Sequence, residues 1–146
     1  MHILWLALRS VLAVLAGIFV TSIVSFAIEI PVLALASKTL PQTFPDRAAL
    51  EVSVAWMLSQ WLYTAPALVL GGYVAAWLAP GRGLAHAAAM AIVQELLIVA
   101  LIFNPPHPVP PWMWLLTLTL APLAILCGGY LRTRHRGQVP LTSGQR

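Results

Sequence analysis

The stretches "WMLSQWLYTAPALVLGGY" (Trp56–Tyr73) and "WMWLLTLTLAPLAILCGGY" (Trp112–Tyr130) decide the fold. Each is an uncharged apolar run close to the roughly 20 residues that cross a bilayer as a helix. Both carry Trp-Met, Ala-Pro and Gly-Gly-Tyr in the same order, at an offset of 56 that becomes 57 if Cys127 is an inserted residue. We interpret the pair as a duplicated membrane-spanning helix, since chance similarity between apolar runs explains the shared order less well.

The composition of the whole chain indicates the same environment. Hydrophobic residues make up 60% of it and charged residues only 8%, whereas soluble domains carry about 25% charged residues. Twelve charged side chains cannot cover the surface of a 146-residue soluble protein. Strands would need a closed barrel and an alternating pattern, so the sequence predicts an all-α membrane protein.

Four apolar segments predict four spans in a single domain, residues 1–131, followed by a basic tail, residues 132–146. The expected spans are residues 11–36, 52–79, 84–103 and 112–131. The first segment is too long for the apolar region of a signal peptide and contains Glu29, so we expect it to be a retained helix.

The first and third spans also resemble each other, because "EIPVLAL" (Glu29–Leu35) matches "ELLIVAL" (Glu95–Leu101) at an offset of 66. Chance explains this weaker match about equally well. If it is real, the chain is a four-helix transmembrane bundle built from two tandem hairpins in the same orientation. Parallel repeats of this kind are related by an axis along the membrane normal.

Basic residues predict the orientation, since positive charges collect on the cytoplasmic side of membrane proteins. One side of the predicted membrane holds Arg9, Arg82, Arg132, Arg134, Arg136 and Arg146. The other side holds Lys38 and Arg47. We therefore expect an inner-membrane protein with both termini in the cytoplasm. Anionic lipid is the expected partner of the basic tail, and nucleic acid is not expected because no polar domain exists to shape a groove for it.

Small residues and prolines in the second and fourth spans predict how the helices pack. Gly71 and Gly72, with Gly128 and Gly129, would let neighbouring helices approach closely. Pro66 and Pro122 would each free a backbone carbonyl and bend their helices. Packing accounts for these residues better than a functional hinge does.

Glu29 and Glu95 are the only ionisable side chains well inside apolar runs. Acidic residues are costly in hydrocarbon, so both should face the bundle interior or a water-filled cavity. Helical spacing and depth place Gln60 and Thr117 in the same layer as the two acids, with Gln94 beside them. This layer is a candidate proton or cation site. We favour the alternative, in which the acids are neutral hydrogen-bonding groups that fix the helix register.

No other chemistry is expected from the sequence. The single cysteine, Cys127, excludes an internal disulfide and a clustered Cys/His metal site. No nucleophile with a matching base, phosphate loop or redox dithiol is present, so we expect no metal, no cofactor and no enzyme activity.

Several motifs resemble a family of small, uncharacterised bacterial membrane proteins with four spans. The matching positions are Gly71, Gly72, Tyr73, Ala75, Ala76, His86, Ala87, Pro106, His107, Pro108, Trp112, Pro122, Gly128 and Gly129. An inserted "VPP" before Trp112 departs from the family's turn. The resemblance implies a bacterial inner-membrane location and implies no activity.

Three functions follow from these observations. The first is a non-enzymatic accessory or assembly subunit that packs with itself, as a homo-oligomer, or with a membrane-protein partner. The second is a small transporter or channel-like oligomer that uses Glu29 and Glu95 to bind protons or cations. The third and weakest is an intramembrane enzyme.

Overall fold

The described part of the chain folds into four long helices. The computed structural model describes residues 2–39, 50, 53–79, 81–105 and 108–137. The helices are α1 (His2–Thr39), α3 (Val54–Leu78), α4 (Gly83–Phe103) and α5 (Pro111–Gly137). All four are long and apolar enough to cross a membrane. The predicted all-α four-helix transmembrane bundle is therefore confirmed, and the chain is a multi-pass integral membrane protein.

The helix ends differ from the predicted spans mainly where a helix leaves the apolar region. Both α3 and α4 begin and end within two residues of the predictions. In contrast, α1 begins at His2 instead of residue 11, and α5 continues to Gly137 instead of ending at residue 131. A helix satisfies its own backbone hydrogen bonds in water as in lipid. It can therefore continue past the hydrocarbon boundary through charged residues such as Arg9 and Arg134.

Large apolar side chains cover the outside of the bundle. Phe103 is 84% exposed and Leu62 is 79% exposed, while Ala67, Ala75 and Ala87 are fully buried. Small residues inside and large apolar residues outside are the pattern expected when lipid is the solvent, because helices then associate by close packing.

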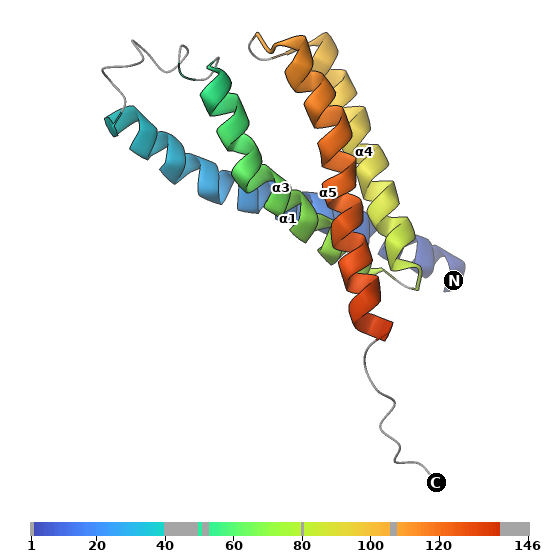
Figure 1. Cartoon of the computed structure of the whole chain (residues 1–146). Coiled ribbons are helices and arrows are strands. Elements are labelled where there is room, and N and C mark those ends of the chain that lie inside the picture. Colours follow the sequence, from blue (N-terminus) through green and yellow to red (C-terminus); the bar gives the residue numbers. More distant parts are fainter. Residues whose placement is uncertain (1, 40–49, 51–52, 80, 106–107, 138–146) are drawn as a thin grey trace.

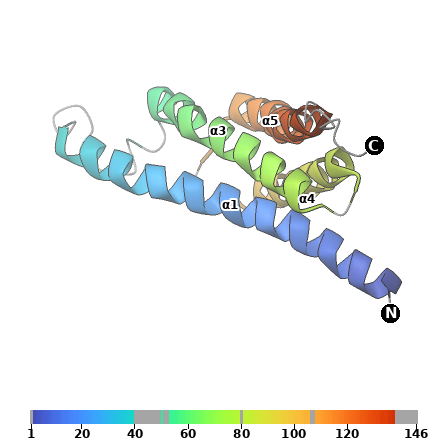
Figure 2. The ribbon, with the colours of Figure 1, turned by 90° about the horizontal axis from the view of Figure 1, so that it is seen from below.

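The helix α3 lies at the centre of the arrangement. It packs between α1 on one side and α5 on the other, and α4 packs mainly against α5 (Figures 1 and 2). The 38 residues of α1 span about 57 Å at 1.5 Å per residue, well over the roughly 30 Å of hydrocarbon. This length is consistent with the oblique path of α1 across the other three helices in Figure 1.

Three prolines lie inside the helices. Pro66 and Pro122 occupy the interiors of α3 and α5, and Pro31 lies inside α1. Each helix continues through its proline, so the missing backbone hydrogen bond is tolerated locally. Pro31 was not among the residues expected to bend a helix.

Glycines bring the parallel helices α3 and α5 into backbone contact. A Cβ atom on Gly72 would collide with the carbonyl of Ile125, and a Cβ atom on Gly128 would collide with the carbonyl of Val69. Both equivalences use the offset of 56, with no insertion at Cys127. The offset of 57 that aligns the two Gly-Gly-Tyr motifs is therefore wrong as a structural register, because one extra residue would rotate each following side chain by about 100°.

Candidate polar cleft between the four helices

A cleft of about 330 Å³ lies between the helices, and all four contribute to its wall. More than half of its lining residues are polar. They comprise Thr21, Ser22, Ser25 and Glu29 of α1, Gln60 and Thr64 of α3, Gln94 of α4 and Thr117 of α5. The cleft therefore gathers polar side chains from all four helices of a bundle whose outer surface is apolar.

The cleft collects four of the five polar residues that the sequence singled out. These residues are Glu29, Gln60, Gln94 and Thr117. They come from four different helices, and all of them line this one cleft. Helical periodicity explains this convergence, since each of these residues lies on the inward face of its helix; Gln94 follows the buried Ala87 and Ala91 at helical spacing.

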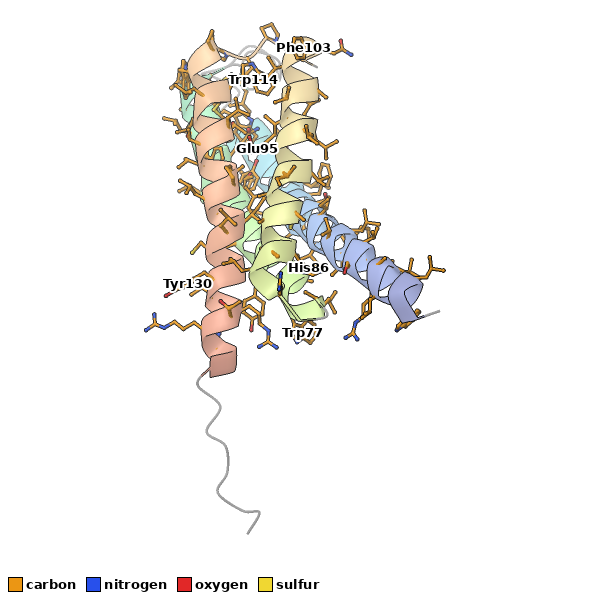
Figure 3. The ribbon with its side chains drawn as sticks, turned by 90° about the vertical axis from the view of Figure 1, so that its right-hand side faces the viewer. Trp77, His86, Glu95, Phe103, Trp114 and Tyr130 are labelled. Carbon is orange, nitrogen blue, oxygen red and sulfur yellow. The ribbon has the colours of Figure 1, made fainter. Side chains whose placement is uncertain are left out.

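The fifth residue, Glu95, lies elsewhere. It lines a second cavity of about 370 Å³, formed by α4 and α5, whose other lining residues are all apolar. Figure 3 shows Glu95 between these two helices, in the half of the bundle nearer to Phe103 and Trp114. Successive residues of a helix point about 100° apart, and of these two neighbours only Gln94 lines the cleft. The expected single layer containing both glutamates is not what the structure has.

Three of the five hydroxyl groups that line the cleft, those of Thr21, Ser22 and Thr117, donate to backbone carbonyls. Thr117 Oγ1 donates to the carbonyl of Met113 at 2.9 Å, within α5. Thr21 Oγ1 lies 3.0 Å from the carbonyl of Gly17 and 3.3 Å from that of Ala67, on the neighbouring helix α3. These hydroxyls therefore fix helix positions and have little remaining capacity to donate to a ligand.

The carboxyl and amide groups are different. In the part of the chain that the structure describes, no hydrogen bond or ion pair engages the side chains of Glu29, Gln60 or Gln94. Among the described lining residues there is also no Lys, Arg or His. The cleft thus holds one acidic group and two amides whose hydrogen-bonding capacity is available.

Aromatic side chains form part of the same region. Trp61 and Phe26 line the cleft, and the buried Nε1 donor of Trp61 has no partner among the described residues. Tyr63 is 93% buried, its hydroxyl also lacks a described partner, and it lies within electrostatic range of Glu29. Sequence reasoning missed Trp61, because a tryptophan in an apolar span reads as a lipid-facing or interfacial residue.

Burying Glu29 in this position is costly unless something offsets it. A carboxyl group within a spanning helix costs a few kcal/mol even on the lenient insertion scale. Neighbouring amides, water or a bound cation would each offset that cost, and the cleft is both polar enough and large enough to hold them.

No family model, curated protein or solved structure matches this chain. The resemblance to small bacterial four-span proteins therefore stays a prediction from the motifs. Functional inference consequently depends on the cleft itself.

Proposed function

We propose that this integral membrane protein binds a cation, or a proton, in the cleft at Glu29 and carries it as a small transporter or channel-like protein. The proposal is supported by one observation: four helices turn polar side chains into one cleft, whose described lining residues include a carboxyl group and no basic residue. An acidic group at this depth, without a partner among the described residues, is typical of ion and proton pathways.

Chemistry favours a cation over an anion. A carboxylate attracts a positive charge strongly where the surroundings have a low dielectric constant. The amide oxygens of Gln60 and Gln94 would complete the coordination of a cation, since both residues line the same cleft. The role is non-catalytic, because these groups bind and orient an ion and do not attack a substrate.

Flux through proteoliposomes tests the proposal. The purified protein is reconstituted with a trapped pH indicator, and a potassium diffusion potential drives proton entry; parallel vesicles test sodium and potassium entry. We expect flux above that of protein-free vesicles with the wild-type protein. Glu29→Gln should reduce it to the protein-free level, while Glu29→Asp should retain part of it.

Glu95→Gln provides a matched control. It makes the same chemical change to the other intramembrane carboxyl, which lies outside the cleft. Flux should survive Glu95→Gln and be lost in Glu29→Gln. Wild-type protein that passes none of the three ions, or a Glu29→Gln variant with full flux, would contradict the proposal.

An accessory or assembly subunit is the second candidate function. The large apolar residues on the outer faces, such as Phe103, Leu62 and Leu96, support it because they leave extensive helix surface for a membrane partner. Glu29 would then only fix helix register, and Glu29→Gln would leave assembly unchanged. The two functions are separated by the flux measurement.

A bacterial inner membrane with both termini in the cytoplasm is the proposed location. Antiparallel order puts Arg9, Arg82 and Arg132 at one end of the four helices, and positively charged ends favour the cytoplasm. A reporter fused after Arg146 should be active only in its cytoplasmic form.

A further inference from the structure

Apolar side chains complete the wall of the cleft at Glu29. Eight of the described lining residues are polar, and the other six are Phe26, Trp61, Leu68, Ile98, Met113 and Ala121. These six also come from all four helices. A ligand in the cleft therefore meets a carboxyl group together with aromatic and aliphatic surface.

The size of the cleft favours a molecule over a single metal ion. Its volume of about 330 Å³ corresponds to about ten water molecules at roughly 30 Å³ each, and it falls at the lower end of the range for small-molecule sites. A metal ion would fill this space only by keeping most of its hydration water. The six apolar side chains offer that water no hydrogen bond, so a hydrated ion fits the cleft poorly.

Trp61 presents aromatic carbon to the cleft. It follows Gln60 in α3 and packs against the buried core of the bundle, which fixes its position. Its indole nitrogen is enclosed, so the exposed part of the side chain is carbon. Aromatic rings attract cations, tryptophan most strongly, and the attraction grows where water is excluded. Trp61 therefore supplies a surface that suits a weakly hydrated cation.

Phe26 places a second ring beside the carboxyl group. It precedes Glu29 by three positions in α1, and residues at this interval are neighbours on one helix face. Both residues line the cleft, and Phe26 is 61% exposed, so it lies at the edge of the cleft. Negative charge and aromatic surface therefore lie side by side where a ligand would enter.

We propose that the cleft binds a small organic cation of the substituted-ammonium class, with its charged nitrogen at Glu29 and its apolar substituents against Trp61 and Phe26. This inference rests on the proposed function, because it takes Glu29 as the group that binds the cation. The carboxylate attracts the charge, and the apolar substituents gain by leaving water. A neutral apolar molecule would leave the carboxyl group unsatisfied, and a metal ion would leave the aromatic wall unused.

Equilibrium dialysis of the purified protein in detergent micelles tests the ligand class. The radiolabelled probe is benzyltrimethylammonium, which joins one aromatic ring to a permanently charged nitrogen, and protein-free micelles give the background. Tetramethylammonium has the same charge without the ring, so we expect it to bind at least tenfold more weakly. Sodium and potassium at the same concentration should not displace the probe. No saturable binding of the probe, or equal affinity for tetramethylammonium, would overturn the proposal.

Substitution of Trp61 tests the aromatic contact. Trp61→Phe keeps a ring and should bind benzyltrimethylammonium within threefold of wild type, whereas Trp61→Leu should bind it at least fivefold more weakly. Trp77→Leu is the matched control, because Trp77 also belongs to α3 but is not among the described residues that line the cleft. Its affinity should stay within twofold of wild type. A loss in Trp61→Leu no larger than that in Trp77→Leu would refute the aromatic contact.

The carrier and the organic ligand fail in different measurements. Ion flux that Glu29→Gln abolishes, without saturable binding of benzyltrimethylammonium, would refute the organic ligand and leave the proposed function standing. Binding that Glu29→Gln weakens at least tenfold, in a protein that passes no ion, would refute the proposed transport and support the organic-cation site.

Discussion

Gly72 on α3 and Gly128 on α5 occupy equivalent positions on the two sides of one helix contact. Each lacks the Cβ atom that would collide with a carbonyl of the other helix, that of Ile125 for Gly72 and that of Val69 for Gly128. Both contacts use the same offset of 56 positions. Two parallel helices are therefore related by a local two-fold axis, which is the geometry expected of a duplicated span.

Replacing either glycine should destabilise the bundle. In Gly72→Ala and Gly128→Ala the new methyl group meets backbone atoms, which cannot rotate away, so α3 and α5 must move apart. Overpacking typically costs about 1–3 kcal/mol, and we expect the upper part of that range for each variant. Unfolding in mixed micelles, with the detergent SDS as denaturant and circular dichroism as readout, measures the loss.

The matched control for the glycine variants enlarges an aliphatic side chain at an exposed position. Ala100 is exposed on α4, so Ala100→Val should change the unfolding free energy by less than about 0.5 kcal/mol. If the glycine variants were as stable as Ala100→Val, the close backbone contact between α3 and α5 would be disproved.

Thr21 should contribute to the contact between α1 and α3 through its hydroxyl group. This hydroxyl lies within hydrogen-bond distance of a carbonyl on each helix, Gly17 and Ala67. Thr21→Val keeps the shape and removes the donor, so we expect a loss of roughly 0.6 kcal/mol, the average for hydrogen bonds between membrane helices.

The control for Thr21 is Thr119, which is exposed and bonds only to carbonyls of its own helix, those of Leu115 and Leu116. Thr119→Val should therefore leave the unfolding free energy nearly unchanged. A larger loss in Thr119→Val than in Thr21→Val would show that the bond to Ala67 contributes nothing between the helices.

Hydropathy located the helices well. In lipid each spanning segment must satisfy its backbone hydrogen bonds internally, so a run of about 20 apolar residues has few conformations other than a helix. It located helix ends poorly where charged residues continue a helix into water, as after Leu131 in α5. The duplicated motif predicted the relationship between α3 and α5, but aligning its tyrosines gave the wrong register. A match between residue types does not by itself show which face of each helix contacts its neighbour.

The polar cleft, like the helix packing, was predictable from the sequence only in part. Helical spacing and depth put Glu29 and Gln60 in one layer, and so these two residues were expected together. Glu95 was expected in the same layer with Gln94 beside it, whereas only Gln94 lines the cleft. Spacing alone did not settle which of these two adjacent polar residues, about 100° apart, faces inward. That decision depends on how α4 rotates against α5, which is set by packing such as that of Gly129 on Ala87.

The two tyrosines of the repeated motif should differ in their contribution to stability. The Arg132 guanidinium lies 5.9 Å from the centre of the Tyr73 ring, and His135 meets the same ring edge-on at 6.5 Å. Tyr130 is 55% exposed. Tyr73→Ala should destabilise the bundle by more than Tyr130→Ala, and a double-mutant cycle of Tyr73→Ala with Arg132→Gln should give about 0.5–1 kcal/mol of coupling. A coupling energy of zero would mean that the contact between Arg132 and Tyr73 does not stabilise the packing of this end of α5 against α3.

Water in the cleft is the last prediction, and it can be tested without knowing the ion. Thiols react with maleimides as thiolates, which form in water and not in hydrocarbon. In the Cys127→Ala background, Ser25→Cys places a thiol in the cleft and Leu62→Cys places one on the outer surface, where Leu62 is 79% exposed. A water-soluble maleimide should label Ser25→Cys at least tenfold faster in intact membranes, although the leucine position is the more exposed of the two. The difference should disappear once the bundle is unfolded: after extraction into SDS both thiols should react at similar rates. Faster labelling of Leu62→Cys in membranes would mean that the cleft is dry and the outer surface is wet, which is incompatible with a bundle that hides its polar groups from lipid.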